Sequence, residues 1–279
     1  NHVDISLAYS SLFRAYYNLP PDITTTNVQL ALSQSELLIE VAQIYDSVHI
    51  IRAHIGNIFS QFRQKLNIAI KDNPPRWLKL SIALESPAIF TEALIHLVGS
   101  HPAWPWRTKS VTIPQNVLKV IKEKADHLNE LCAEAERDLF LNTIEAADGG
   151  PTTIENDFEG WCTVQVFRDW YCARLNTIIS KAGDQRVMER GTLYRAMGKG
   201  GDSYLPYDEV LASLRNNVKS DDWTDLADDL KRLKKYAKDT VHDLCKNELM
   251  LDVDNHNIGY LTCVDVEVKD FPWMAQEGN

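Results

Sequence analysis

The chain has 279 residues, of which 44% are hydrophobic, and its formal net charge at pH 7 is −10. This length allows one large domain or two smaller ones with their own cores. The acidic balance argues against binding to nucleic acid or to an anionic membrane surface. No apolar run has the length of a membrane span or the form of a secretory leader.

The five cysteines indicate a reducing compartment. Their number is odd, and no two have the CxxC spacing of a zinc or redox site, so free thiols are expected. No Asn-x-Ser/Thr glycosylation site occurs. We therefore expect an intracellular protein of the cytoplasm, the nucleus or both. The chain begins with Asn1 and enters an apolar pattern almost at once, which suggests a piece of a longer protein.

Apolar residues at helical spacing predict three helices in the first part of the chain. The first covers residues 7–17 and ends at Asn18. Thr26 or Asn27 can cap the second helix, and the third runs over about residues 48–70.

The next segment predicts a helical hairpin. Pro75 stands at the start of one helix, and Ser86 with Pro87 supplies an N-cap and a first-turn proline for another. The second helix ends at Gly99, a residue that favours a left-handed C-cap. Two helices joined by so short a break must pack on each other or on the preceding helix.

Two later segments carry narrow apolar seams with alternating spacings of three and four, typical of close helix pairing. The first seam follows Pro114 and consists of Leu118, Ile121, Ala125, Leu128, Cys132, Ala135 and Leu139. The second consists of Trp223, Leu226, Leu230, Leu233, Ala237 and Leu244. We expect these seams to face each other within one chain, because three heptads is a lower limit for a dimeric coiled coil.

The remaining segments differ in character. Residues 158–179 are apolar nearly all round, which predicts a central buried helix. Residues 183–204 read as an irregular region with room for a short helix, and residues 249–253 and 260–268 predict a small C-terminal β-hairpin. The expected fold is therefore mainly α, built from antiparallel helical pairs, with this hairpin at the end.

A run of basic residues precedes the last part of the second seam. Lys231, Arg232, Lys234 and Lys235 are flanked by Asp228, Asp229 and Asp239 at spacings of three and four. These spacings predict intrahelical ion pairs on a solvated face.

No catalytic, cofactor or metal signature is found. The glycine-rich stretch 197–203 resembles a phosphate loop, but a Walker motif needs Ser or Thr directly after the lysine, and Lys199 precedes Gly200. Asp252, Asp254 and His256 imitate a calcium loop whose Gly and Glu positions are filled by other residues. We expect no catalytic activity, no cofactor and no metal.

One loop has the composition of a binding site. Residues 101–107 place Trp104, Trp106 and Arg107 on a segment stiffened by prolines. These residue types dominate interaction hot spots. The alternative is that both indole rings fold back onto the helical core, as tryptophans usually do.

The sequence resembles fungal BTB/POZ domain proteins in several blocks that follow one another in the same order. The blocks are LFRAYYNLPPDI, ALSQSELLIEVAQIYDSVHIIRAHIGNIFSQFRQ, PPRWLKLSIALESPAIFTEALIHLVGSHPAWPW and IGYLTCVDVEVKDFPW. The resemblance implies that residues 1–72 are the second, helical half of a BTB-like domain. It also implies that residues 73–279 are similar to the helical BACK extension of cullin adaptors.

The resemblance has implications for partners. In that family the helix equivalent to residues 10–17 lies near the cullin-binding surface, which marks Leu12, Phe13 and Tyr16 as candidate protein-interaction residues. A cullin scaffold is then a candidate partner, although residues 11–14 lack the acidic residue that such adaptors often carry after a hydrophobic one. We expect the strand-bearing half of the BTB domain to lie outside this chain and the full-length protein to form a homodimer through it.

The expected function is that of an intracellular protein–protein interaction module, a BTB-type adaptor or scaffold. Two alternatives stay open. One is a homo-oligomeric structural protein in which the two seams pair between chains. The other is an enzyme whose catalytic residues are dispersed in the sequence, around the Gly198–Ser203 loop for example, because catalytic sites are defined by geometry and not by order.

Overall fold

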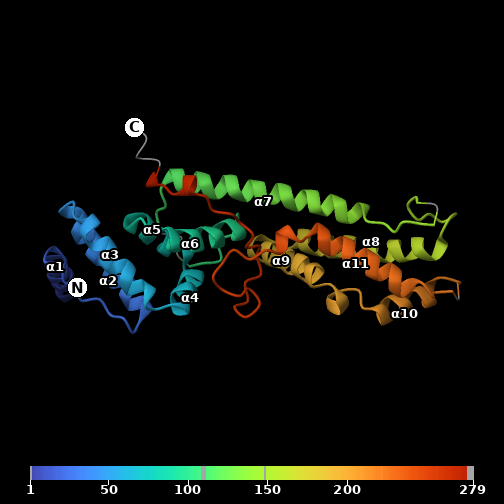
Figure 1. Cartoon of the computed structure of the whole chain (residues 1–279), viewed down its shortest axis with the longest axis horizontal. Coiled ribbons are helices and arrows are strands. Elements are labelled where there is room, and N and C mark those ends of the chain that lie inside the picture. Colours follow the sequence, from blue (N-terminus) through green and yellow to red (C-terminus); the bar gives the residue numbers. More distant parts are fainter. Residues whose placement is uncertain (1, 108–110, 148, 221, 275–279) are drawn as a thin grey trace. The chain divides into compact units, whose positions relative to one another are not determined.

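The computed structural model describes residues 2–107, 111–147, 149–220 and 222–274. Within these residues the chain forms eleven α-helices, three short 3-10 helices and no β-strand (Figure 1). The prediction of a mainly α-helical fold is therefore confirmed, whereas its assignment to the BTB class stays a prediction.

The chain divides into two compact units. Unit 1 holds the described residues up to Lys124, together with Glu248–His256 and the residues from Val264 on, and unit 2 holds Ala125–Asn247 and Asn257–Cys263. The domain boundary that the resemblance implies, between residues 72 and 73, lies inside unit 1.

Unit 1 contains the N-terminal helices and a short 3-10 helix near its C-terminal end. They are α1 (His2–Tyr16), α2 (Val28–Ile44), α3 (Val48–Ser60), α4 (Gln64–Asp72), α5 (Pro74–Leu84), α6 (Pro87–Ser100), the start of α7 (Gln115–Leu141) and η3 (Val268–Asp270). Helices α1, α2 and α3 pack against one another, and α5 and α6 form the predicted hairpin beside α4 (Figure 1).

Local signals explain some of these helix ends. The predicted left-handed C-cap at Gly99 is not formed, because α6 continues to Ser100 and its C-cap is His101, whose φ is −61°. The side chain of Asn27 accepts hydrogen bonds from the backbone N–H groups of Gln29 and Leu30, both at 3.0 Å, so α2 begins with the predicted cap. The predicted third helix is wrong in one respect, because it breaks into α3 and α4 at Arg63, whose φ is 49°. The break lets the side chains of Phe59 and Phe62 both lie in the core.

The core of unit 1 is built around two aromatic clusters. Trp77 on α5 is completely buried and meets the ring of Phe59 edge-on, with 4.9 Å between the ring centroids. Phe90 on α6 meets Phe271 and Trp273 edge-on at 5.6 and 5.4 Å. These contacts join the C-terminal segment to the α5–α6 hairpin. Each such aromatic pair stabilises the fold by about 0.5–1.5 kcal/mol in addition to the effect of burying its apolar surface.

Unit 2 contains the remaining helices. They are the rest of α7, α8 (Phe158–Ser180), α9 (Gly183–Lys199), η1 (Gly201–Ser203), α10 (Tyr207–Asn217), α11 (Leu226–Thr240) and η2 (Asp243–Cys245). The five cysteines are all free, and Cys132 and Cys162 are buried. Burial raises the pKa of the Cys132 thiol to about 11, so this thiol is protonated and unreactive at pH 7.

Both predicted seams are buried, with the exception of Leu118. They are not, however, each other's main neighbours. The α11 seam packs chiefly on α8 and α9. On α7, Glu136 accepts a hydrogen bond from the hydroxyl of Tyr194 on α9 at 2.9 Å. The expectation that the two seams face each other was therefore wrong, because α11 packs on the apolar helix α8 and on α9, whose helix the sequence pattern did not reveal.

The region predicted to be irregular, residues 183–204, is helical up to Lys199. The apolar pattern of this helix, α9, is weak because one of its faces packs against the backbone of another segment and not against side chains. A Cβ atom on Gly191 would lie 2.2 Å from the carbonyl oxygen of Gly259, so the two segments touch at this glycine. One turn later, the Arg195 guanidinium donates hydrogen bonds to the carbonyl oxygens of residues 258, 259 and 260 at 2.7, 2.6 and 3.0 Å.

The predicted C-terminal hairpin is not formed, and in this part of the described chain only an isolated bridge joins Asn247 and Thr262. Two side chains form hydrogen bonds with backbone groups that would otherwise pair in a β-ladder. Arg195 occupies the carbonyl oxygens at 258–260, and Glu92 accepts the N–H of Met250 at 3.0 Å. The segment is therefore held by side chains from helices and not by strand pairing.

The contact at Gly191 makes a prediction about stability. Gly191→Ala should lower the free energy of unfolding by about 1–3 kcal/mol, because overpacking against backbone forces the segments apart. Urea denaturation measures this change. Gly56→Ala, on α3, is the matched control: its Cβ meets nothing within 4 Å, so it should be neutral or stabilise by up to about 1 kcal/mol. Equal effects of the two substitutions would contradict the contact.

Candidate functional site

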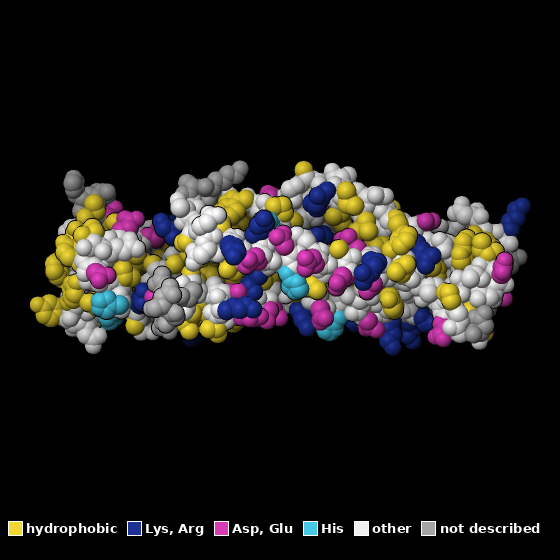
Figure 2. Space-filling view, turned by 90° about the horizontal axis from the view of Figure 1, so that it is seen from above, with side chains coloured by type: hydrophobic (Ala, Val, Ile, Leu, Met, Phe, Trp, Pro, Cys, Tyr) yellow, Lys and Arg dark blue, Asp and Glu magenta, His cyan; other side chains and the backbone are white. Residues whose placement is uncertain are grey.

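Exposed apolar side chains are concentrated at the N-terminal end of unit 1. Among the described residues, ten of the twenty-two exposed large hydrophobic side chains precede residue 46. Figure 2 shows hydrophobic atoms crowded over the part of unit 1 that holds α1–α3. Contiguous exposed patches of this kind mark interaction sites in soluble proteins, whereas isolated apolar residues do not.

Four aromatic side chains on α1 and at the end of α2 form the centre of this surface, which we call the aromatic patch: Tyr9, Phe13, Tyr16 and Tyr45. The rings of Tyr9 and Tyr45 meet edge-on at 6.2 Å, and those of Phe13 and Tyr16 lie 6.5 Å apart. Phe13, Tyr16 and Tyr45 are 59%, 46% and 54% exposed.

The patch exists because α1 carries two apolar stripes. Ala8, Leu12 and Ala15 are spaced i, i+4, i+7 and are buried. Tyr9, Phe13 and Tyr16 repeat the same spacing one residue later, which turns them about 100° around the helix and away from the core.

Of the residues that the resemblance marks on this helix, Phe13 and Tyr16 therefore lie on the surface, whereas Leu12, only 1% exposed, is a core residue. The stripe that contains Tyr9 was readable in the sequence. Tyr45 was not, because its position depends on how α2 packs on α1.

Polar contacts fix the orientation of the rings. The hydroxyl of Tyr16 is hydrogen-bonded to the hydroxyl of Ser47, which in turn donates to the carbonyl oxygen of Tyr45 at 2.8 Å. The pKa of Tyr45 is raised mainly by a hydrogen bond with Tyr9 and, to a smaller extent, by the electrostatic interaction between the two phenols. The phenol is therefore neutral at pH 7, and the patch presents aromatic rings with hydroxyl groups and no charge of its own.

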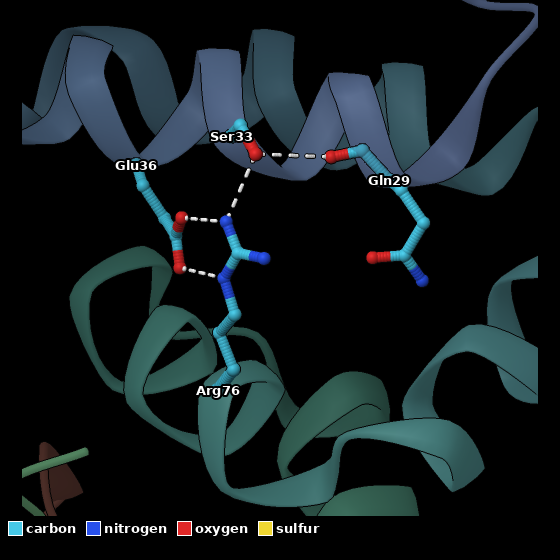
Figure 3. Close-up of polar contacts among 4 residues, drawn as sticks. All are labelled: Gln29, Ser33, Glu36 and Arg76. Atoms are coloured by element: carbon cyan, nitrogen blue, oxygen red, sulfur yellow. Dashed lines mark hydrogen bonds and ion pairs between the residues drawn. The ribbon is translucent and has the colours of Figure 1, made fainter. Parts of the chain in front are cut away.

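A two-pronged ion pair joins the middle of α2 to α5. Figure 3 shows the Arg76 guanidinium, on α5, facing the Glu36 carboxylate on α2. Arg76 Nε donates to Glu36 Oε1 at 2.7 Å, and Nη2 donates to the other carboxylate oxygen and to Ser33 Oγ at 2.9 Å. The hydrogen bonds with Glu36 raise the pKa of Arg76 despite partial burial.

A small groove lies between α1 and α2, on a different face of α1 from the aromatic patch. Its volume is about 190 Å³, and Leu7, Leu30 and Leu37 line it together with Asp4 and Asp22. The volume is below the range of about 300–1,000 Å³ that is typical of small-molecule sites. The groove has room for a single inserted side chain.

The tryptophan loop has a partly structural role. The indole N–H of Trp106 donates to the carbonyl oxygen of Lys71, at the end of α4, at 3.0 Å. The rings of Trp104 and Trp106 meet edge-on at 6.0 Å and are partly buried. Only Arg107 is exposed among the three predicted docking residues. The geometry favours the alternative in which the rings fold back onto the helices.

Other kinds of site were sought in the described residues. No group of three or more His, Cys, Asp or Glu side chains is arranged to hold a metal there. None of the described helices combines the length and apolar character needed to cross a membrane. No family model, no curated protein and no solved structure matches the chain.

The hydrogen bond of Trp106 makes the next prediction. Trp106→Phe keeps an aromatic ring but removes the donor, so it should lower the free energy of unfolding by about 1 kcal/mol. Arg107→Ala is the control and should change it by less than about 0.5 kcal/mol, because the side chain is exposed. Thermal and urea unfolding measure both variants, and a Trp106→Phe variant as stable as the wild type would show that the ring is not docked.

Proposed function

We propose that this protein is an intracellular protein–protein interaction module without catalytic activity, and that the aromatic patch is its binding surface. The observation that carries the proposal is the exposed rings of Phe13, Tyr16 and Tyr45, together with the half-buried ring of Tyr9 that meets Tyr45. Tyrosine and phenylalanine are enriched in protein interfaces because a large ring buries much area at a low cost in conformational entropy.

The form of the surface supports a protein as its ligand. The patch is aromatic and carries tyrosine hydroxyl groups, and the groove between α1 and α2 has room for one side chain from a partner. The aspartates at the rim of the groove, Asp4 and Asp22, favour a partner with a basic residue beside an apolar anchor.

The resemblance to BTB/POZ proteins supports a narrower proposal, that of a BTB-type adaptor or scaffold. In that family the helix equivalent to α1 lies near the surface that binds a cullin. Phe13 and Tyr16 are exposed on this helix, as such a role requires. A cullin is therefore the first partner to test, with the reservation that residues 11–14 contain no acidic side chain.

The alternative of a homo-oligomer formed by the two seams has less support. Nearly all seam residues are buried within one chain, so they offer no apolar surface to a second copy. A second copy that docks on the aromatic patch is instead an outcome that the experiment below distinguishes.

The experiment places a photo-cross-linking amino acid at position 13 of the complete protein in cells, and at Ile179, an exposed apolar position of unit 2, as a control. We expect position 13 to capture one defined protein and position 179 to capture none reproducibly. A second copy of the chain at position 13 would replace the adaptor proposal with a homo-oligomer.

Affinity is then measured with the purified captured partner. Phe13→Ala with Tyr45→Ala should weaken binding at least tenfold, about 1.4 kcal/mol, because central aromatic residues are hot spots. Phe140→Ala with Ile179→Ala removes a comparable exposed apolar area from unit 2 and should leave the dissociation constant unchanged. Equal affinities for the two double variants would overturn the proposal.

A further inference from the structure

A pocket in unit 2 concentrates positive charge in an otherwise acidic protein. It has a volume of about 400 Å³ and lies between the end of α9, the turn η1, α10 and α11. Its charged lining consists of Lys199, Lys231, Lys234, Lys235, Lys238 and a single carboxylate, that of Asp202.

The lysines of α11 do not form the intrahelical pairs that their spacing predicts. In the described part of the chain, the one ion pair of this basic run joins Arg232 to Asp229 at 3.8 Å. Lys231, Lys235 and Lys238 have no carboxylate partner among the described residues. Their spacing of i, i+4, i+7 places all three on one face of α11, the face that lines the pocket.

The fourth lysine of α11 holds the glycine turn in place. Lys234 Nζ donates to the carbonyl oxygen of Gly201 at 2.7 Å and lies 5.4 Å from the ring centroid of Tyr204. Partial burial lowers the pKa of Lys234, opposed by the charge of Asp202. Lys234 is therefore a positioning residue, and Lys231, Lys235 and Lys238 supply the accessible charge.

The glycine turn leaves room for a ligand. Gly200 and Gly201 have φ values of 68° and 56°, which a residue with a Cβ rarely adopts. A Cβ atom on either glycine would meet no atom within 4 Å, so the backbone faces open space. The stretch lacks the Walker sequence pattern, and the sequence gives no sign that α11 lies opposite it.

We propose that this pocket binds a small organic anion that carries two or more phosphate groups. Lysine ammonium groups act as point charges suited to phosphate, whereas planar recognition of single carboxylates favours arginine. The ring of Tyr207, with Ala227 and Leu230, provides an apolar wall for the carbon skeleton of the ligand. The volume lies within the range of small-ligand sites.

The phosphate groups can belong to a soluble metabolite or to a lipid headgroup, and the test separates the two. Isothermal titration calorimetry of the whole protein with inorganic triphosphate at low salt measures the charge-based affinity. Co-sedimentation with phosphatidylcholine vesicles that contain phosphatidylinositol bisphosphate, against phosphatidylcholine alone, measures lipid binding. Sedimentation only with the phosphoinositide vesicles, and its reversal by triphosphate, would identify a headgroup as the source.

The decisive comparison uses two triple variants with the same change in net charge. Lys231→Gln with Lys235→Gln and Lys238→Gln should weaken triphosphate binding at least tenfold. Lys119→Gln with Lys122→Gln and Lys219→Gln removes three exposed lysines outside the pocket and should leave the affinity within twofold of the wild type. Circular dichroism checks that both fold. Absence of triphosphate binding to the wild type, or equal losses in both variants, would overturn the proposal.

Discussion

We expect the candidate interaction surface to depend on the ion pair between Arg76 and Glu36, which joins α5 to α2. Arg76 is adjacent in sequence to Trp77, the completely buried ring at the centre of unit 1. The Arg76 guanidinium group joins α5 to α2 by donating hydrogen bonds to both carboxylate oxygens of Glu36. Bidentate arginine–carboxylate pairs restrict orientation as well as separation. The clamp therefore ties the middle of α2, whose main helical neighbours are α1 and α3, to α5.

A rigid α2 matters because a binding surface loses affinity when its parts must be ordered on contact. The aromatic patch combines one stripe of α1 with one residue that follows α2. Only if the two helices keep their relative position do the rings of Tyr9 and Tyr45 stay in edge-on contact. The bond between Tyr16 and Ser47 adds a second restraint at the same end.

Much of the fold could be predicted where a single residue acts locally. Asn27 caps α2, Pro87 opens α6, and the helical content follows from apolar spacing. The break at Arg63 could not be predicted, because neither glycine nor proline marks it and the positive φ is imposed by the packing of Phe59 and Phe62. The missing hairpin has a similar cause, since Arg195 and Glu92 occupy the backbone groups of that segment.

The candidate sites show the same division. The stripe of Phe13 and Tyr16 could be read from its spacing, whereas the contribution of Tyr45 required the packing of α2 on α1. For the lysines of α11, spacing favoured ion pairs along the helix. The fold instead turns Lys231, Lys235 and Lys238 toward a glycine turn that lies about thirty residues earlier in the chain. Local rules fail here because the charges respond to a tertiary contact.

Amide hydrogen exchange of α2 in the Arg76→Gln variant tests the central claim most directly, namely that the clamp holds the surface rigid. If it does, the slowest amides of Val28–Ile44 should exchange at least tenfold faster than in the wild type, a loss of about 1.4 kcal/mol in local stability. Those of α8, in unit 2, should exchange at the wild-type rate. Unchanged exchange in α2 would contradict the account, because the helix would then be held without the clamp.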